Sequence, residues 1–431
     1  MGASVLSRQQ ERSYGSVWAL VFIFAVAWWV QFAARASPGA VPMTPGSPVA
    51  AFEGDAPVAN SAEWLSRRAP LLREAFLTRV YGALPRLTAE DASHHTIDAD
   101  ALDGSAHLEL LTLRLEPSIT PLNVALLTPR SGRPAPLIIL SNFCGLDHDV
   151  DRRLPSPSWR AARCRSGLGR AVAQLSHGDA ILRPPVREMI ARGYAVAVFY
   201  AGDVAPDNSE LFRQSPVGRL SDHQESGAIA AWAALYLATF QTLRLDPRIA
   251  PSRIAVWGHS RFGKAALLAA ALEPRIGAVI ANQSGTFGAT LSSATRGESE
   301  RQIMRRFPHW FPTEIAATTP ARAANGFDQH LLLALLAPRP VLLGNAGLDR
   351  WSDPAAAFAA ARAASDAYAL FDSAGLDQPS MRRSNLAADI AFYVRPGGHG
   401  VRSSDWSRAL DFLDVHFRSD VGARAAMARG V

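Results

Sequence analysis

The sequence predicts an α/β fold with a doubly wound, mostly parallel sheet and helices on both faces. From about residue 136 onward, short apolar segments alternate with helical ones, an alternation that is typical of parallel sheets. The centres of these segments are apolar throughout, as expected for strands that helices cover on both faces. A chain of 431 residues can bury a large core, and we expect one folded domain.

The expected elements follow in a regular order. Segments 107–116 and 123–129 have the pattern of antiparallel strands. Six segments that each begin with a short buried strand then end at Phe143, Tyr200, Gly258, Asn282, Gly347 and Gly400. The clearest helices are predicted at 226–243, 262–272 and 404–417. In sheets of this kind ligands bind at the carboxyl ends of the strands. Polar residues at those ends are therefore the candidates for chemistry.

The N-terminal segment has the pattern of an export signal. Arg8 and Arg12 precede an apolar stretch at about 17–30, which is followed by the A-x-A pattern of Ala34 to Ala36. The stretch is shorter than the ~20 apolar residues of a membrane-spanning helix. We interpret 1–36 as a cleaved signal peptide, with an uncleaved membrane anchor as the alternative. A Pro/Gly/Ala-rich linker at 37–57 and a domain at 58–431 follow, and we expect a periplasmic or extracellular location.

Composition excludes several classes of protein. The net charge is +6, but Arg alternates with acidic residues and no basic run is present, so we expect no nucleic-acid partner. No CxxC or HExxH motif occurs, and we expect no metal or other cofactor and a monomeric protein. His148, flanked by two aspartates, has too few neighbouring ligands for a metal site. Cys144 and Cys164 can form one bridge if the chain is exported.

Ser260 has the sequence context of a nucleophile elbow. It follows a predicted strand and precedes a predicted helix, and such a turn lifts a serine hydroxyl clear of the sheet. Backbone N–H groups and the helix N-terminus then face any oxyanion that forms. Gly258 provides the small residue before the serine, but Phe262 replaces the usual glycine after it and Gly263 comes next. The alternative is a serine that caps a core helix.

A serine nucleophile needs a base and an orienting acid, which in α/β-hydrolases follow in the order Ser, acid, His. His399 comes directly after the last predicted strand, in the turn "RPGGHG". Asp349 comes directly after the preceding predicted strand. Asp353 is the alternative acid, but the Pro that follows it suggests a helix start. His309 and His330 are expected to be packed and hydrogen-bonded.

Several segments resemble the glucuronoyl esterases, carbohydrate esterase family 15. They are "VFYAGDVAPD", "GHSRFGKAAL", "FPHWF", "FDQHLLLALLAPRPV", "LDRWSDP" and "YVRPGGHG", in order and within about 192–417, with a weaker similarity at "LIILSNFCG". The family also lacks the second glycine of the elbow. The resemblance implies an α/β-hydrolase fold and cleavage of esters between (4-O-methyl-)glucuronic acid on xylan and lignin alcohols.

The resemblance also implies roles for individual residues. Ser260 would be the nucleophile, His399 the general base and acid, and Arg261 a stabiliser of the oxyanion. Lys264 would bind sugar hydroxyls, assisted by Glu298 and Trp351. Lys264 is the single lysine among 44 basic residues, which suggests a specific contact. Its spacing from Arg261 predicts that the two share one face of the helix.

Gln283 is a departure from the family pattern. Many members have an acid at this position, and an amide cannot supply the charge that stabilises an imidazolium. We therefore predict that Asp349 is the acid of a Ser-His-Asp triad. The resulting interpretation is an exported serine esterase that acts on glucuronate esters through an acyl-enzyme. The alternatives are an acetyl- or acyl-esterase for carbohydrates and an inactive carbohydrate-binding protein on the same fold.

Overall fold

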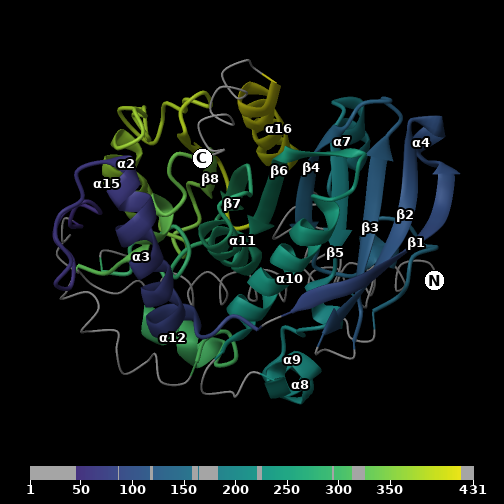
Figure 1. Ribbon diagram of the computed structural model, residues 1–431, viewed down its shortest axis with the longest axis horizontal. Helices are drawn as coiled ribbons and strands as arrows, with labels where there is room; N and C mark the ends of the chain where they lie inside the picture. The colour runs from purple at the N-terminus through teal and green to yellow at the C-terminus, as the bar shows by residue number, and fades with distance from the viewer. Residues whose placement is uncertain are drawn as a thin grey trace, which may run out of the picture. The chain divides into compact units, whose positions relative to one another are not determined.

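A computed structural model describes residues 45–85, 87–116, 120–157, 164, 183–220, 226–293, 296–312 and 326–418 (Figure 1). These residues belong to one compact unit, 41–431. The predicted signal or anchor segment, 1–36, and the first part of the predicted linker lie outside the described residues. Among the helices that are described, none combines the length and apolar character needed to cross a membrane.

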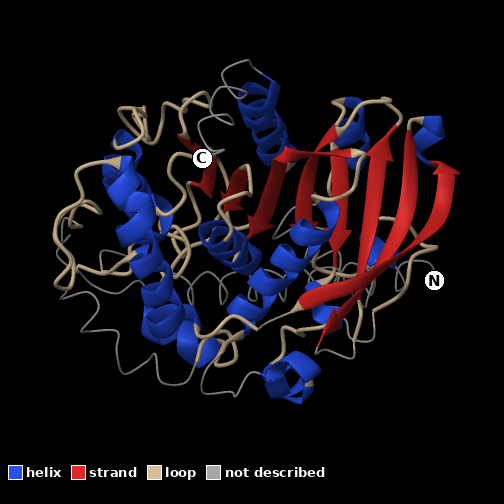
Figure 2. Ribbon diagram, in the orientation of Figure 1, coloured by secondary structure: helices blue, strands red, loops and turns tan. Residues whose placement is uncertain are grey.

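A single mixed sheet organises the described part of the chain (Figure 2). Its strand order is β1-β2-β3-β5-β4-β6-β7-β8-β9. The strands are β1 Thr88–Asp100, β2 Ala106–Glu116, β3 Leu122–Pro129, β4 Ala135–Ser141, β5 Ala195–Phe199, β6 Ile249–His259, β7 Ala278–Asn282, β8 Val341–Ala346 and β9 Ile390–Arg395. The pairs β1–β2, β2–β3 and β3–β5 are antiparallel, and every pair from β5 to β9 is parallel. The predicted mostly parallel sheet is confirmed.

The helices cover both faces of this sheet, as predicted. Leu137 and Ile139 of β4 join the larger core cluster, with side chains from α3, α10, α11, α14 and α15. Ile138 and Leu140 point to the other face and join a second cluster with α7 and α16. The described helices are α2 Ser61–Glu63, η1 Trp64–Arg68, α3 Ala69–Phe76, η2 Leu77–Tyr81, α4 Ala101–Gly104, α5 Leu146–Asp149, α7 Val186–Ala191, η5 Ala201–Asp203, α8 Ser209–Gln214, α9 Pro216–Leu220, α10 Ala228–Leu243, α11 Arg261–Leu272, α12 Glu300–Arg306, α14 Gln329–Ala334, α15 Pro354–Ala369 and α16 Ser403–Arg418.

Strand β1 was not predicted. Its sequence, TAEDASHHTIDAD, has no apolar alternation and carries several residues that are uncommon in strands. It lies at the edge of the sheet and pairs along most of its length with β2. Charged and polar side chains are compatible with an edge strand because one side of its backbone faces no neighbouring strand. Pairing with β2 therefore decides its structure, and pattern analysis of the segment alone could not detect it.

The second half of the predicted linker is part of the domain, which corrects the expectation for 37–57. Phe52 is buried in the larger core cluster and its ring lies 6.1 Å from that of Phe327. Asp55 forms an ion pair with the buried guanidinium of Arg68, 2.7 Å away. Arg68 also donates to the carbonyl of Pro48 at 2.6 Å. A segment rich in Pro and Ala can thus pack against the domain once apolar and charged anchors hold it.

A disulfide joins Cys144 to Cys164, with 5.5 Å between the two Cα atoms. Cys144 lies just after β4, where its sulfur is buried, and Phe143 beside it is part of the larger core cluster. The bridge closes a loop over a sequence separation of 20 residues. A covalent link of this length restricts the unfolded chain and so stabilises the folded one.

Replacing both cysteines by serine is expected to lower the free energy of unfolding by about 3 kcal/mol, because the loop is no longer closed in the unfolded chain. Urea unfolding of the wild type with and without reductant measures the difference. The double variant is the control, since reductant should leave its unfolding curve unchanged. Equal stability of oxidised and reduced wild type would contradict the expectation.

Candidate active site

Ser260 forms a sharp turn between β6 and α11. Its backbone has φ 57° and ψ −123°, a conformation that L-residues rarely adopt. The turn brings Gly258 against the first turn of α11, where a Cβ on Gly258 would lie 2.1 Å from the carbonyl oxygen of Phe262. The N–H of Ser260 donates to the carbonyl of Asn282 on the neighbouring β7, at 2.9 Å. The serine therefore has the geometry of a nucleophile elbow, as the sequence predicts.

The phenylalanine after the elbow has a packing role. The ring of Phe262 lies 4.9 Å from Phe143 and 5.2 Å from Trp232, in edge-on contacts inside the core. The close approach to a neighbouring segment occurs instead at Gly263, whose hypothetical Cβ would lie 3.1 Å from the Cβ of Ser284, just after β7. The glycine that normally follows the serine by two residues is therefore not needed here, because the helix approaches β7 one residue later.

The side chains of Ser260, His399 and Asp349 form a chain of contacts, and each residue follows the end of a different parallel strand. His399, in the turn after β9, has Nε2 3.0 Å from Ser260 Oγ. Its Nδ1 lies 2.7 Å from Oδ2 of Asp349, which follows β8. A carboxylate beside Nδ1 selects the tautomer with a proton on Nδ1, so Nε2 accepts the proton of the serine hydroxyl. The distances are those of a nucleophile, a base and an orienting acid.

Asp349 is held as a carboxylate. It is buried, which acts to raise its pKa, but His399 and hydrogen bonds from Ser352 have the larger combined effect and keep the pKa of Asp349 below its usual value. The N–H of Ser352 donates to its second oxygen at 3.2 Å. Asp353 has the role of a helix start, as its sequence context suggests. It caps α15 by accepting a hydrogen bond from the N–H of Ala356 at 3.2 Å. Its side chain therefore acts in the fold of α15.

Arg261 lies on the other side of the serine, against Asp207. Its Nε is 3.0 Å from Oδ2 of Asp207 but the N–H bond does not point at that oxygen, so the contact is a charge pair without an aligned hydrogen bond. Asp207 also accepts from Trp310 at 2.8 Å and contacts His309 at 3.1 Å. Burial acts to raise the pKa of Asp207, but Arg261 and these bonds outweigh it and lower the pKa. The packed position expected for His309 is confirmed.

Asp207 is a site residue that the sequence analysis missed. It comes eight residues after the end of β5, so it too belongs to the carboxyl edge of the sheet. The signal was present in the segment "GDVAPD", which follows a buried strand and contains two acids. Which of these acids meets Arg261 depends on the path of the loop, and the sequence alone does not determine that path.

Lys264 is buried beneath the loop that follows β7. Its ammonium donates to the carbonyl of Ser284 and, at 2.6 Å, to that of Thr286. Burial lowers the pKa of Lys264 to about 8, although the carboxylates of Glu298 and Asp349 act in the opposite direction. An ammonium has three donors. Among the described contacts two of them are used by the loop, which leaves one for a ligand.

Arg261 and Lys264 are three residues apart on α11, but their charged ends contact different parts of the molecule. Arg261 points to Asp207 and lies over the ring of Phe143, with its Cζ 4.9 Å from the centroid. Lys264 points to the loop carbonyls after β7. An acid on one loop and backbone carbonyls on another therefore hold the two side chains apart, although both belong to α11.

Glu298 and Trp351 lie together near Lys264. The N–H of Glu298 donates to the carbonyl of Trp351 at 2.9 Å, and the two side chains are also hydrogen-bonded. Glu298 is buried, which raises its pKa, while Lys264 and Arg306 act to lower it. Arg306 approaches the Trp351 ring with 6.0 Å between its Cζ and the centroid. The three residues that the sequence analysis grouped thus form one cluster of a cation, an acid and an aromatic ring.

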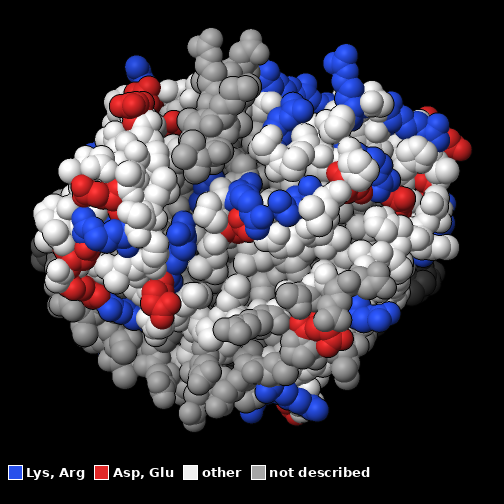
Figure 3. All heavy atoms as spheres, viewed as in Figure 1, with Lys and Arg blue, Asp and Glu red and all other residues white. Residues whose placement is uncertain are grey.

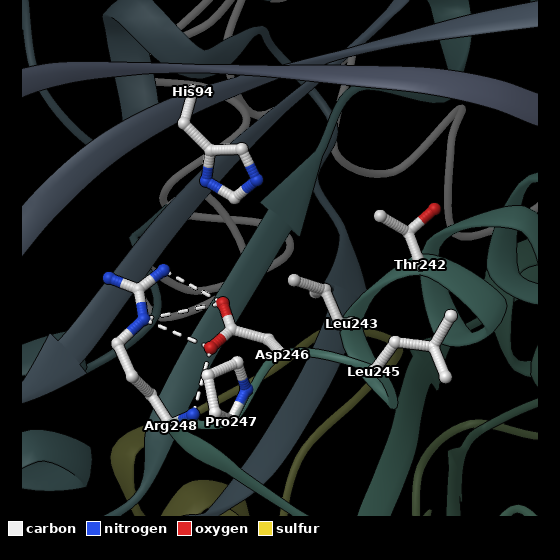
Figure 4. A pocket seen from close by; sticks show the side chains of 7 residues that line it. All are labelled: His94, Thr242, Leu243, Leu245, Asp246, Pro247 and Arg248. Carbon is white, nitrogen blue, oxygen red and sulfur yellow. Dashed lines mark hydrogen bonds and ion pairs between the residues drawn. The ribbon is translucent and has the colours of Figure 1, made fainter.

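The described residues also include a group of possible metal ligands and a pocket away from Ser260. Cys144, His148 and Asp149 have ligand atoms close together, but the sulfur of Cys144 is in the disulfide and cannot act as a thiolate. A pocket of about 390 Å³ is lined by residues that precede β6 and by His94 (Figure 4). It lies at the opposite end of β6 from Ser260. There Arg248 forms an ion pair with Asp246 at 2.7 Å.

The geometry agrees with comparisons to known proteins. A curated carbohydrate esterase, MZ0003, from an unknown prokaryotic organism is 30% identical over 374 residues, which are 83% of this chain and 86% of that protein. The chain belongs to the glucuronoyl esterase family, carbohydrate esterase family 15. The family profile described as "Glucuronyl esterase, fungi" matches residues 179–372. This glucuronoyl esterase family member is a carboxylic-ester hydrolase, of the class that acts on glucuronic acid esters.

Relatives and solved structures extend the comparison. A 4-O-methyl-glucuronoyl methylesterase of Wolfiporia cocos is 30% identical over 189 residues, 41% of this chain and 46% of that protein. A glucuronoyl esterase structure from Solibacter usitatus has a TM-score of 0.75 and 26% identity, covering 89% of this chain and 99% of that one. A promiscuous esterase of the family from a marine bacterial metagenome has a TM-score of 0.74 and 28% identity, covering 88% and 98%. The α/β-hydrolase fold is confirmed.

Replacing Gly258 by alanine is expected to prevent folding or to lower the free energy of unfolding by more than about 3 kcal/mol, because the new methyl group would overlap the carbonyl of Phe262. Gly263→Ala should cost less, since the nearest atoms to its added carbon are 3.1 and 3.2 Å away. Gly46→Ala is the control, with no atom within 4 Å of the added carbon. Thermal and urea unfolding rank the three. A stable, active G258A protein would refute the tight elbow.

Proposed function

We propose that the chain is an exported serine esterase that hydrolyses esters of (4-O-methyl-)glucuronic acid on xylan, at lignin–carbohydrate ester bonds. The observation that carries the proposal is the contact chain from Ser260 Oγ through His399 to the Asp349 carboxylate, at 3.0 and 2.7 Å. Family membership supports the substrate class. The N-terminal sequence pattern and the Cys144–Cys164 bridge support export, because disulfides persist mainly in oxidising compartments.

The first half of the reaction forms an acyl-enzyme. His399 Nε2 takes the proton of Ser260 Oγ as the oxygen attacks the ester carbonyl of the glucuronate. Negative charge develops on the carbonyl oxygen, where the N–H of Arg261, its guanidinium and the N-terminus of α11 stabilise it. The carboxylate of Asp349 stabilises the imidazolium. When the tetrahedral intermediate collapses, the C–O bond to the alcohol breaks, and the alcohol leaves with the proton from His399.

The second half releases the acid. Water loses a proton to His399 Nε2 and attacks the acyl carbonyl, and the same donors stabilise the second oxyanion. Collapse breaks the bond to Ser260 Oγ, which recovers its proton from His399. Free glucuronate then leaves. Lys264, Glu298 and Trp351 hold the sugar in this scheme, since a buried cation, a buried acid and an aromatic ring suit hydroxyl groups and a sugar face.

A broader acyl-esterase is the second candidate. The observation in its favour is the similarity to a structure described as a promiscuous esterase of the same family. The third interpretation, an inactive binding protein, rests on Gln283 and would be favoured if Asp349 lay beyond hydrogen-bond reach of His399. Its carboxylate is 2.7 Å from the imidazole, which argues against that interpretation.

The purified protein from residue 37 onward is expected to cleave benzyl glucuronate, and Ser260→Ala is expected to abolish the cleavage, because the variant lacks the hydroxyl that accepts the acyl group. The assay compares benzyl glucuronate with a simple acetyl ester, and circular dichroism confirms that the variant is folded. Cleavage of the acetyl ester alone would favour the acyl-esterase. A folded wild type that cleaves neither ester would reject the proposed function.

Asp349→Asn is expected to lower kcat by roughly 10³- to 10⁴-fold, because an amide stabilises neither the imidazolium nor the required tautomer. Asp353→Asn, in the same loop, is the matched control. It should weaken the cap of α15 by about 1 kcal/mol or less and leave kcat unchanged. Steady-state kinetics and thermal unfolding on both variants test the assignment. Comparable kcat losses in the two would count against Asp349 as the acid.

A further inference from the structure

Gln283 makes a pair of hydrogen bonds to the turn that carries His399. It lies directly after β7 and is 2% exposed. Its side-chain Nε2 donates to the carbonyl of Gly398 at 3.2 Å. Its Oε1 accepts from the N–H of Gly400 at 2.9 Å. The opposite orientation of the amide would face oxygen with oxygen and N–H with N–H, so the network fixes which end is which.

The two groups that Gln283 binds belong to the peptide groups on either side of His399. The carbonyl of Gly398 belongs to the peptide group before the Cα of His399, and the N–H of Gly400 belongs to the peptide group after it. A side chain that binds both peptide groups restricts the φ and ψ angles of the residue between them. Glycines on both sides place few steric limits on this turn, so its shape depends on hydrogen bonds. Gly397 and Gly400 have φ values of 97° and 156°, which other residues rarely adopt.

The other anchor of the turn cannot replace this contact. Arg395 is buried in an ion pair with Asp405, at 2.7 Å, and donates to the carbonyls of Gly398 and Gly400 at 3.3 and 2.6 Å. A guanidinium has donors only. The N–H of Gly400 needs an acceptor, which the Oε1 of Gln283 provides. The two anchors share the carbonyl of Gly398, but only Gln283 provides the acceptor for the N–H of Gly400 among the described contacts.

Gln283 is itself held firmly. Its backbone N–H donates to the carbonyl of Gly344 on β8 at 2.7 Å. The hydroxyl of Ser352 lies 3.4 Å both from the carbonyl of Gln283 and from Nδ1 of His399. Gln283 has φ 49°, which is uncommon for a residue other than glycine. Residues held in such conformations are found where the surrounding structure requires them, often beside functional groups.

We propose that Gln283 is a positioning residue for His399: its carboxamide fixes the two peptide groups that flank the histidine, and Asp349 alone supplies the acid. A carboxylate at this position would keep the bond from Gly400 but would set an acceptor against the carbonyl of Gly398. An amide is required at this position because it can donate to the carbonyl of Gly398 and accept from the N–H of Gly400 at the same time. The proposal rests on the proposed role of His399 as the general base.

The test compares two substitutions of Gln283 with the same substitutions of Gln378. Gln378 is also buried, donates to the carbonyl of Ser380 at 3.0 Å and accepts from the N–H of Phe392 at 3.2 Å. It thus also donates to one backbone carbonyl and accepts from one backbone N–H, but its partner on β9, Phe392, lies within the strand and not in the turn of His399. Gln283→Glu and Gln283→Met are measured beside Gln378→Glu and Gln378→Met. The readouts are kcat and KM on benzyl glucuronate, the rate of Ser260 labelling by a fluorophosphonate, and thermal unfolding.

Both Gln283 variants are expected to lose about 10²-fold in kcat with little change in KM, because a misplaced base slows the chemical step without weakening sugar binding. Labelling of Ser260 should slow in parallel. Both Gln378 variants should unfold at lower temperature and keep kcat within twofold. If Gln283→Met does not fold, Gln283→Glu decides, since it preserves the volume and one of the two bonds.

Two results would overturn the proposal. One is wild-type kcat and labelling in Gln283→Glu. The other is a loss of kcat that follows thermal stability equally in the Gln283 and Gln378 variants, which would mean a purely structural role. Activity of the wild type and its loss in Ser260→Ala are measured in the same series. The proposed function can therefore stand or fall independently of Gln283.

Discussion

The turn at Ser260 is the constraint on which the rest of the site depends. A serine at φ 57° between β6 and α11 exposes its hydroxyl at the edge of the sheet, and it is tolerated only because Gly258 has no side chain to meet the carbonyl of Phe262. The hydrogen bond from its N–H to Asn282 ties the turn to β7. Once the hydroxyl is placed there, the base, the acid and the cation must come from loops that leave the same edge.

The parallel half of the sheet makes this convergence possible. Strands β5 to β9 all end at one edge, and the segments after them carry Asp207, Ser260, Gln283, Asp349 and His399. In the proposed mechanism each residue has one function: a nucleophile, a base, an acid, a partner for the arginine beside the serine, and an anchor for the turn of the base. Basic and acidic side chains are interspersed on the face seen in Figure 3. The electrostatics of the site therefore depend on the charged residues fixed inside it.

The single lysine has a physical explanation in the structure. Lys264 reaches two carbonyls of the loop after β7 from within the core, in a space shared with buried carboxylates. A compact ammonium can place its donors around one point, whereas a planar guanidinium needs acceptors arranged in one plane. Lys264 thus anchors the start of this loop, at Ser284 and Thr286. In a chain that otherwise uses arginine, this position is one where the difference between the two cations matters.

The sequence by itself determined the α/β architecture, the elbow at Ser260 and the positions of Asp349 and His399 after later strands, because these depend on local patterns: apolar strands, a small residue in a tight turn and chain order. Tertiary structure decided the rest. β1 forms through its pairing with β2, Phe52 and Arg68 hold the segment expected to be a linker, and Arg261 turns to Asp207 while Lys264 turns to another loop. The bonds of Gln283 join residues 115 and 117 positions apart. Such contacts depend on which loops meet in space, and no pattern of neighbouring residues encodes that meeting.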